Sequence, residues 1–197
     1  MQRHKHRYLY KTYNDLLKLI KEYGNKFDIN TINKAYMFAE QAHKGQIRKS
    51  GLPYILHPVS VAYILVELGM DTTSIVAALL HDVVEDTDVT LEQVRKIFGK
   101  EVAKLIDGVT KIGKISLMSR EEEQAENLRK MLIAMANDVR VIIVKLADRL
   151  NNMRTISCMP EQKQRDKSLE NMEVYAPIAH RLGIRSIKEE LEDISLK

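Results

Sequence analysis

The sequence contains little of what disulfide-rich, sheet-forming or membrane-spanning proteins require. Cys158 is the only cysteine in 197 residues, which excludes a disulfide scaffold and fits a reducing cytoplasm. Only 8 glycines and 4 prolines occur, whereas leucine, isoleucine, lysine, glutamate and alanine are abundant. This balance favours an all-α protein. The basic start of the chain is not followed by an uninterrupted apolar stretch, so we expect neither a signal peptide nor a transmembrane segment.

The charge of the chain is modest. Its net charge is +4 and its sequence pI is about 9.0, which fits either an anionic partner or an ordinary solvated basic surface. No arginine-rich run with interleaved aromatic residues is present, so we expect no direct nucleic-acid partner. With 45% hydrophobic residues, the chain can bury a core as one large domain or as two tightly joined ones.

The spacing of apolar residues predicts a series of helices joined by short turns. The β-branched run 141–144 continues into a helical pattern, so we interpret it as buried helix. Residues 44–53 are interrupted by glycine and proline and are expected to form a loop, and residues 113–120 are expected to form a mobile one. Helices are expected over 12–23, 30–43 with a cap at Asn30–Thr31, 57–69, 72–82 with a cap at Asp71 or Thr72, 88–99, 100–112, 121–136, 138–154, 162–181 and 185–194.

Acidic residues end two apolar runs of the sequence. The pair His81–Asp82 follows the run 75–80, and Asp148 follows the run 141–147. Two buried helices that each end in an acid would carry uncompensated charge unless the acids converge on a cation. His57, at the predicted start of another helix, adds a further donor.

The sequence therefore predicts a metal site with four protein ligands, His57, His81, Asp82 and Asp148. Each residue alone has an ordinary structural explanation, and only their combination points to a metal. Two imidazoles and two carboxylates suit a divalent ion such as Mn²⁺, Fe²⁺ or Zn²⁺. Four ligands would saturate tetrahedral zinc, whereas an octahedral ion keeps positions open for water and a substrate oxygen. Catalysis at this site therefore favours manganese or iron.

Two further carboxylates follow the histidine–aspartate pair. Glu85 lies four residues after His81, so one more helical turn would place both side chains on the same side. There Glu85 could orient or deprotonate a water whose pKa a metal lowers, or protonate a leaving group, and Asp86 could share this role. The ordinary alternative is a solvated helix end.

Cationic residues surround the predicted site and indicate an anionic substrate. Arg48, Lys49 and Ser50 lie in the loop before His57, and such side chains at a loop can bind phosphate or stack on a nucleobase. Other polar residues lie along the predicted helix that carries Asp148. These are Lys145, Arg149, Asn151, Asn152, Arg154 and Thr155. A generic basic surface is the alternative, and it applies most to Arg149 and Arg154.

These residues resemble a known family. The pattern His57, His81–Asp82 and Asp148 matches the HD-domain metal phosphohydrolases. The fuller motifs look like the hydrolase domain of the RelA/SpoT homologues, and a further segment, 175–184, looks like the helix that follows that domain in the long members. The motifs are RKSG at 48–51, YILHP at 54–58, LHDVVEDT at 80–87 and KLADRLNNMRT at 145–155.

The resemblance implies an activity and a role for each matching residue. Such domains use Mn²⁺ to remove the 3′-pyrophosphate from ppGpp and pppGpp, giving GDP or GTP and pyrophosphate. By this resemblance His57, His81, Asp82 and Asp148 hold the metal, and Glu85 and Asp86 serve the attacking water. Arg48, Lys49 and Ser50 contact the guanine nucleotide, with Asn152 and Thr155 on its sugar and phosphate side. Asn151 departs from the many relatives that have histidine, and we expect it to lie beside the site.

The resemblance also implies a larger context. We expect residues 1–197 to form a single HD-type hydrolase domain in an all-α helical bundle. Residues 1–30 would be an N-terminal helical segment, and residues 160–197 would lead towards a synthetase domain. The expected partners are the substrate and the synthetase and regulatory domains of the same full-length chain. We expect cytoplasmic localisation, no membrane partner and no synthetase activity from these residues alone.

Two other functions remain open from the sequence. Another HD phosphohydrolase, acting on a nucleoside triphosphate or a 3′-phosphonucleotide, would use the same metal chemistry. A regulatory module that binds nucleotide or a partner domain without catalysis would have no need of Glu85 and Asp86.

Overall fold

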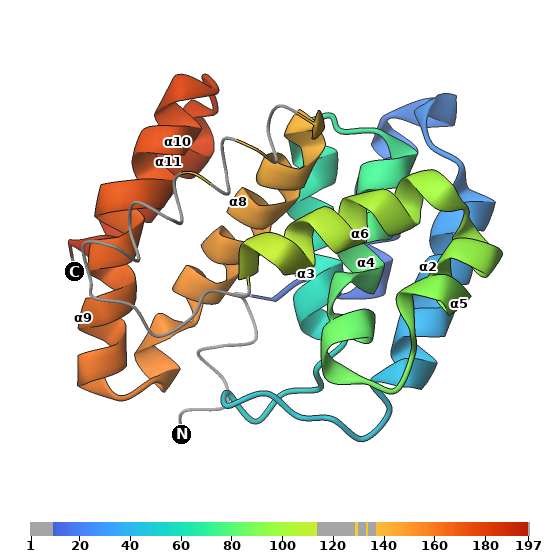
Figure 1. Cartoon of the computed structure of the whole chain (residues 1–197), viewed down its shortest axis with the longest axis horizontal. Coiled ribbons are helices and arrows are strands. Elements are labelled where there is room, and N and C mark those ends of the chain that lie inside the picture. Colours follow the sequence, from blue (N-terminus) through green and yellow to red (C-terminus); the bar gives the residue numbers. More distant parts are fainter. Residues whose placement is uncertain (1–9, 114–128, 130–132, 134–136, 197) are drawn as a thin grey trace.

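Helix α4 (Thr72–Asp86) is the element around which the other helices pack. The computed structural model describes residues 10–113, 129, 133 and 137–196 (Figure 1). Every residue from Ser74 to Val83 is buried, because α4 contacts helices on several sides. These neighbours are α2 (Ile29–Ala42), α3 (Leu56–Glu67), α6 (Lys100–Gly113) and α8 (Val139–Arg154). Because helices surround α4, its sequence has a continuous apolar run and no amphipathic stripe.

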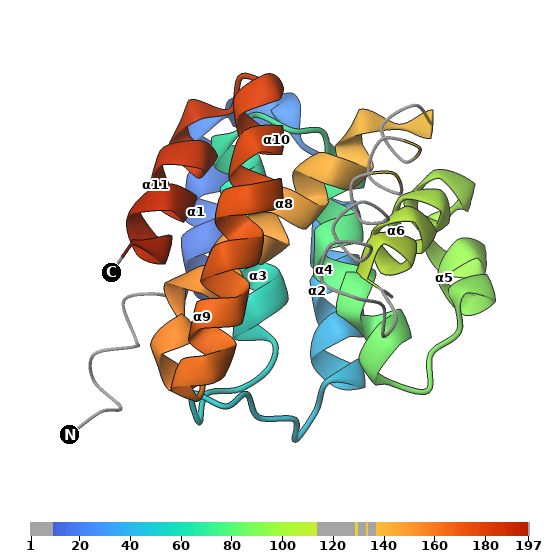
Figure 2. The ribbon, with the colours of Figure 1, turned by 60° about the vertical axis from the view of Figure 1, so that its left-hand side comes forward.

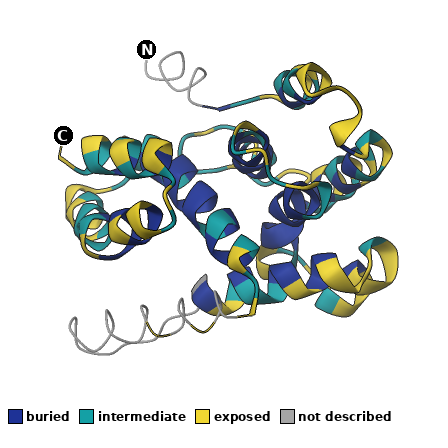
Figure 3. Ribbon diagram, turned by 90° about the horizontal axis from the view of Figure 1, so that it is seen from above, coloured by how far each residue is buried: buried dark blue, intermediate teal, exposed yellow. Residues whose placement is uncertain are grey.

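Shorter helices cover the outside of this group. Helix α1 (Tyr13–Glu22) packs on α3 and is followed by a 3₁₀ turn at Gly24–Lys26. Helix α5 (Leu91–Phe98) packs on α6. Both helices have strongly amphipathic sequences, and Figure 3 shows buried residues concentrated in the middle of the molecule with exposed residues on the outer helices.

The C-terminal helices pack on the other side of α8. They follow a 3₁₀ turn at Ile156–Cys158 and pack against one another. Within this group, α11 packs against α8. Figures 1 and 2 show this group on one side of α8 and α6 on the other. Its elements are α9 (Glu161–Glu170), a π-helical turn (Asn171–Tyr175), α10 (Ala176–Arg181) and α11 (Arg185–Ser195).

The all-α prediction is confirmed. The described part of the chain contains no β-strand. An isolated β-bridge joins Ile47 and Pro53 within the predicted loop 44–53. Where the structure describes them, the predicted helices begin and end within a few residues of the observed ones. Residues 141–144 are helical as expected, with Val141, Ile142 and Val144 buried. The predicted helix 162–181 is helical throughout but contains the π-helical turn.

One predicted cap is wrong. Asp28, not Asn30–Thr31, caps α2, because its carboxylate accepts a hydrogen bond from the Thr31 amide at 3.1 Å. The predicted Asp71 cap of α4 is confirmed. The predicted loop 113–120 and helix 121–136 lie almost entirely outside the described residues. None of the described helices is both long enough and apolar enough to cross a membrane.

Candidate active site

The four predicted metal ligands meet at one buried point between α3, α4 and α8. His57 is the second residue of α3, His81 and Asp82 lie in the second half of α4, and Asp148 lies on α8. His57 Nε2 is 3.2 Å from Asp148 Oδ1 and 3.5 Å from Asp82 Oδ2. His81 Nε2 is 3.1 Å from Asp82 Oδ1. All four side chains are buried, so three distant segments bring two imidazoles and two carboxylates together away from solvent.

Both histidines are held in the orientation that a metal ligand requires. His81 Nδ1 donates to the carbonyl oxygen of Ala78 at 2.7 Å, and His57 Nδ1 lies 2.7 Å from the amide oxygen of Asn151. Because these oxygens accept hydrogen bonds, Nδ1 is the donating nitrogen of each ring, and Nε2 is left facing the carboxylates, where it can hold either a proton or a metal ion. His81 Nε2 is buried and makes no hydrogen bond, although Asp82 Oδ1 is near.

These residues fit a divalent metal ion. The donor atoms of His57, His81 and Asp148 all lie within 4.8 Å of one another, and Asp82 adds a carboxylate beside both imidazoles. Nitrogen lone pairs that face carboxylates across a buried gap are costly unless a cation lies between them. The unbonded Nε2 of His81 is the atom that such a cation would satisfy.

The cluster is electrostatically coupled. Burial lowers the pKa of His81, but Asp82 and Asp148 outweigh this effect and raise it to about 9. Burial raises the pKa of Asp148, but the Lys145 ammonium, 2.9 Å from its Oδ2, and the two histidines hold it well below its usual range. The pKa of Asp82 is lowered by His81 and His57 against the effect of burial. Both carboxylates are therefore ionised near neutral pH and can act as ligands.

Glu85 and Asp86 lie on the last turn of α4, at the solvent side of the cluster, and both are exposed. The Tyr54 hydroxyl is 2.6 Å from Asp86 Oδ2 and 3.0 Å from Asp82 Oδ2, so it shares its hydrogen between the two carboxylates. Burial and both carboxylates raise the pKa of Tyr54, which keeps it a donor. Tyr54 thus connects a predicted metal ligand to a predicted catalytic acid.

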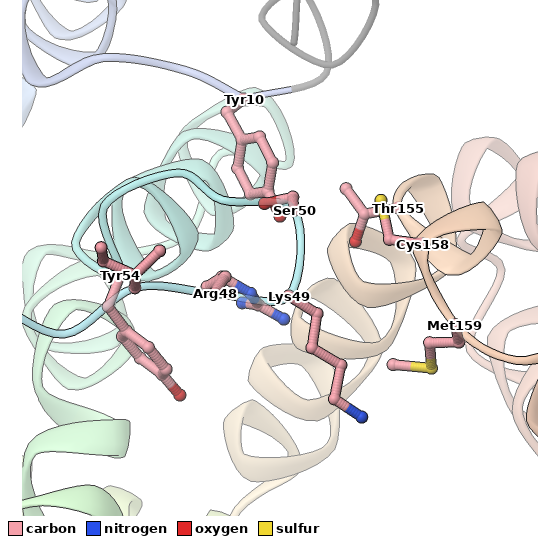
Figure 4. Close-up of a pocket in the computed structure, with 9 residues that line it drawn as sticks. Tyr10, Arg48, Lys49, Ser50, Tyr54, Thr155, Cys158 and Met159 are labelled. Carbon is pink, nitrogen blue, oxygen red and sulfur yellow. The ribbon is translucent and has the colours of Figure 1, made fainter. Parts of the chain in front are cut away.

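A pocket of about 260 Å³ lies beside this cluster. The predicted residues Arg48, Lys49 and Ser50 form one wall, and Thr155 lies on the opposite wall at the end of α8 (Figure 4). Arg48 Nη1 and Ser50 Oγ are buried and have no hydrogen-bond partner, so both are free to bind a polar ligand. The remaining lining residues are Tyr10, Ile47, Tyr54, Cys158 and Met159.

Asn152 joins the pocket to the cluster. Its amide oxygen accepts from Arg48 Nη2 at 2.5 Å, and its amide nitrogen donates to Asp148 Oδ1 at 2.7 Å. Asn152 does not line the pocket, unlike the other four residues predicted to bind substrate. Its observed contacts place the Arg48 guanidinium and the Asp148 carboxylate relative to each other.

Two arginines near the site in sequence, Arg149 and Arg154, form ion pairs with the C-terminal helices. Arg149 is buried against the C-terminal helices, where Nη2 pairs with Glu170 at 2.7 Å and Nε donates to Asn171 at 2.6 Å. Arg154 pairs with Glu190 on α11 at 2.6 Å. These two arginines hold helices together, in contrast to Lys145, which contacts Asp148.

Sequence reasoning missed two residues of the site. Asn151 was expected only beside it, but the structure places it fully buried against His57. Its position three residues after Asp148 on a helix was the available signal, since such residues share a face. Tyr54 was noted within a motif without a role, and a tyrosine carries no sign in sequence of which distant carboxylates it contacts.

Comparison with known proteins gives the family. The family model described as "HD domain" matches residues 35–185, and the chain belongs to the HD-domain family. It is also similar to a solved structure described as a metazoan orthologue of SpoT that hydrolyses ppGpp. That likeness has a TM-score of 0.63 and 28% sequence identity, and it covers 83% of this chain and 93% of the other.

Several curated relatives are more similar in sequence. A GTP pyrophosphokinase of Myxococcus xanthus is 54% identical over 181 residues, which is 90% of this chain and 24% of the relative. A guanosine-3′,5′-bis(diphosphate) 3′-pyrophosphohydrolase of Aquifex aeolicus is 53% identical over 93% of this chain and 26% of the relative. The bifunctional (p)ppGpp synthase/hydrolase SpoT of Escherichia coli K12 is 47% identical over 96% of this chain and 27% of the relative. The chain thus spans about a quarter of the length of these relatives.

Proposed function

We propose that this chain is a Mn²⁺-dependent hydrolase that removes the 3′-pyrophosphate from ppGpp and pppGpp. The products would be GDP or GTP and pyrophosphate. The observation that carries this proposal is the buried cluster of two histidines and two aspartates beside a pocket with unpartnered cationic and hydroxyl donors. Relatives named for this hydrolysis are 47–53% identical to the chain.

His57, His81, Asp82 and Asp148 would hold the metal. When bound, a divalent cation lowers the pKa of water and stabilises negative charge on phosphate oxygens. Two imidazoles and two carboxylates suit a borderline-hard ion that accepts six ligands, which supports manganese over zinc. Lys145 keeps Asp148 ionised and oriented through its 2.9 Å contact.

Glu85 and Asp86 would manage the protons of the reaction. Water attacks the phosphorus that is joined to the 3′ oxygen, the bond between them breaks, and the 3′ oxygen takes up a proton. Glu85 is exposed on the same face of α4 as His81, which suits it to accept the proton of the water and deliver one to the leaving oxygen. Asp86, held by Tyr54, would orient the water.

The pocket would hold the guanine nucleotide. Arg48 Nη1 and Ser50 Oγ, both unpartnered, offer donors to the guanine ring or its phosphates, and Lys49 supplies positive charge at the same wall. Thr155 would contact the sugar and phosphate side from the opposite wall. Asn152 would contribute indirectly, because its side chain orients Arg48 through a 2.5 Å hydrogen bond.

The wider context is also a proposal. We propose that the described helices are one HD-type hydrolase domain, and that synthetase and regulatory domains of the same full-length protein are its partners. This rests on relatives about four times as long, one of which is named as bifunctional. A guanosine nucleotide substrate and a single cysteine support a cytoplasmic location.

The test is pyrophosphate release from ppGpp by the purified chain, stripped of metal and then supplied with Mn²⁺. Wild type is expected to release pyrophosphate only with the metal, and Asp82→Ala is expected to abolish release. Wild type that binds Mn²⁺ and ppGpp without turnover would contradict hydrolysis and favour a regulatory module.

A second comparison tests the substrate. The double variant Arg48→Ala, Lys49→Ala is expected to lose its preference for guanosine substrates while it still binds Mn²⁺. Release of phosphate or pyrophosphate from nucleoside triphosphates or 3′-phosphonucleotides, with ppGpp left intact, would identify another HD phosphohydrolase.

A further inference from the structure

Asn151 is a fully buried amide on α8 whose side chain faces the metal cluster. Its Oδ1 lies 2.7 Å from His57 Nδ1, and its Nδ2 is buried without a hydrogen-bond partner. A buried unsatisfied N–H group costs about 1–3 kcal/mol. Asparagine at this position is therefore unfavourable for packing alone, and its one observed hydrogen bond goes to a predicted metal ligand.

The Nδ1 atoms of the two histidines in the cluster have different kinds of hydrogen-bond acceptor. The Nδ1 atom of His81 donates to the backbone carbonyl of Ala78 within α4, so any residue at position 78 would supply that acceptor. His57 is only the second residue of α3, and its described Nδ1 partner comes from the side chain of a residue on α8. The orientation of His57 therefore depends on the identity of residue 151.

We propose that Asn151 is a positioning residue that accepts the Nδ1 proton of His57 and so presents the Nε2 lone pair to the metal. The inference rests on the proposed metal centre and deepens it. Outer hydrogen-bond partners of metal-bound histidines typically contribute 10- to 100-fold to metal affinity. Asn151 is distinct from Asn152, which contacts Asp148 and Arg48.

Two substitutions separate the acceptor from the rest of the side chain. Asn151→Asp keeps an oxygen acceptor of the same shape and cannot donate through Nδ2. Asn151→Leu keeps the approximate volume but removes both polar groups. If the acceptor is what matters, the Asp variant retains metal affinity and the Leu variant loses it.

The experiment is calorimetric titration of Mn²⁺ into metal-stripped wild type and variants, with the melting temperature of each metal-free protein measured alongside. Asn151→Leu is expected to weaken Mn²⁺ binding by roughly 10- to 100-fold, and Asn151→Asp is expected to bind within about threefold of wild type. Asn171→Leu is the matched control, because Asn171 is equally buried but contacts Arg149 and Ser195. It is expected to lower the melting temperature and leave Mn²⁺ affinity unchanged.

Two results would overturn the inference, and a third would overturn the proposed metal centre on which it rests. Equal Mn²⁺ affinity in Asn151→Leu and wild type would show that His57 needs no side-chain acceptor. An Asp variant as weak as the Leu variant would show that the Nδ2 group, not Oδ1, is required. Wild type that binds no Mn²⁺ would instead overturn the metal centre itself. If Asn151→Leu does not fold, Asn151→Ala is the second variant, and it is expected to show the same loss.

Discussion

At the scale of single residues, the hydrogen-bond partners of the imidazole nitrogens determine what the buried cluster of two histidines and two aspartates can bind. Nδ1 of both histidines is bonded to an oxygen, and Nε2 of both faces the carboxylates of Asp82 and Asp148. Without metal, the same carboxylates attract a second proton to the imidazole, which is why the pKa of His81 is raised to about 9. A proton and a metal ion therefore compete for the same nitrogen.

This competition makes the metal-free protein sensitive to alkaline pH. The pKa of His81 is about 9 when folded, above its ordinary value of 6.5, so its contribution to stability is fully present below pH 6.5 and is lost as pH rises through 9. We expect the free energy of unfolding, measured by urea denaturation in a chelator, to fall by roughly 2–3 kcal/mol between pH 6.5 and 9.5.

Asp82 and Asp148 do not contribute to this change in the free energy of unfolding at alkaline pH. The pKa values of Asp82 and Asp148 are lowered, so their stabilisation is present above about pH 4 and is lost only on acidification. His81→Gln is the control and should flatten the alkaline slope. A slope that persists in this variant would assign the titration to another group.

Tyr54 is the residue whose hydroxyl and ring have separable roles. Tyr54→Phe removes the hydrogen bonds to Asp82 and Asp86 but keeps the ring that lies 5.5 Å from the Arg48 guanidinium. We expect turnover of ppGpp to fall by roughly 10- to 100-fold, with KM nearly unchanged, in steady-state assays with saturating Mn²⁺. A large rise in KM with normal turnover would contradict this assignment.

At the scale of elements, the approach of α6 to α8 is set by one small residue. A β-carbon added at Gly108 would lie 2.8 Å and 3.0 Å from the two methyl groups of Val141. Val141 is buried at the start of α8, so the side chain has no free direction in which to move. The close contact helps to fix α8, and with it Asp148, against α4 and α6.

Gly108→Ala is therefore expected to destabilise the protein although alanine favours helix more than glycine does. Overpacking typically costs about 1–3 kcal/mol, which outweighs the gain of up to about 1 kcal/mol in helix propensity. Thermal denaturation is the measurement. The double variant Gly108→Ala, Val141→Ala restores the space, so its destabilisation should be clearly smaller than the sum of the single effects. Additive effects would argue against direct overlap.

At the scale of the whole molecule, α8 is shared between the site and the C-terminal helices. Asp148 faces the metal cluster, and the next residue, Arg149, faces the opposite group. Arg149 donates to Lys167, Glu170 and Asn171 and lies 4.6 Å from the ring of Tyr175. Adjacent residues on one helix thus face the candidate metal site and the C-terminal helices, respectively.

Arg149→Met tests this division. Loss of the guanidinium leaves the Lys167 carbonyl and the Asn171 amide oxygen without a donor, so we expect destabilisation by roughly 2–4 kcal/mol. Hydrogen exchange should increase mainly in residues 161–195, which this side chain ties to α8. Arg165→Met, on an exposed part of α9, is the matched control and should change neither. Equal effects of the two substitutions would contradict the structural role of Arg149.

Much of the fold and of the candidate site follows from local patterns. Helical spacing, few glycines and capping residues such as Asp71 determine the helices, because hydrogen bonds within a helix are local. His57, His81, Asp82 and Asp148 could be singled out because charged residues at the ends of apolar runs need a partner wherever they pack. Their ligand roles remain predictions. So do the catalytic roles of Glu85 and Asp86 and the substrate-binding roles of Arg48, Lys49, Ser50, Asn152 and Thr155.

Only the tertiary structure decided what each polar side chain contacts across the chain. Asn151 faces His57 from 94 residues away, and Arg48 reaches Asn152 from 104 residues away. Arg149 and Arg154, which lie near the predicted site in sequence, pair with Glu170 and Glu190. The sequence by itself determined which groups had to be compensated, since burial and charge are properties of local patterns. Which group compensates which depends on how the helices pack, and that is settled only when distant segments meet.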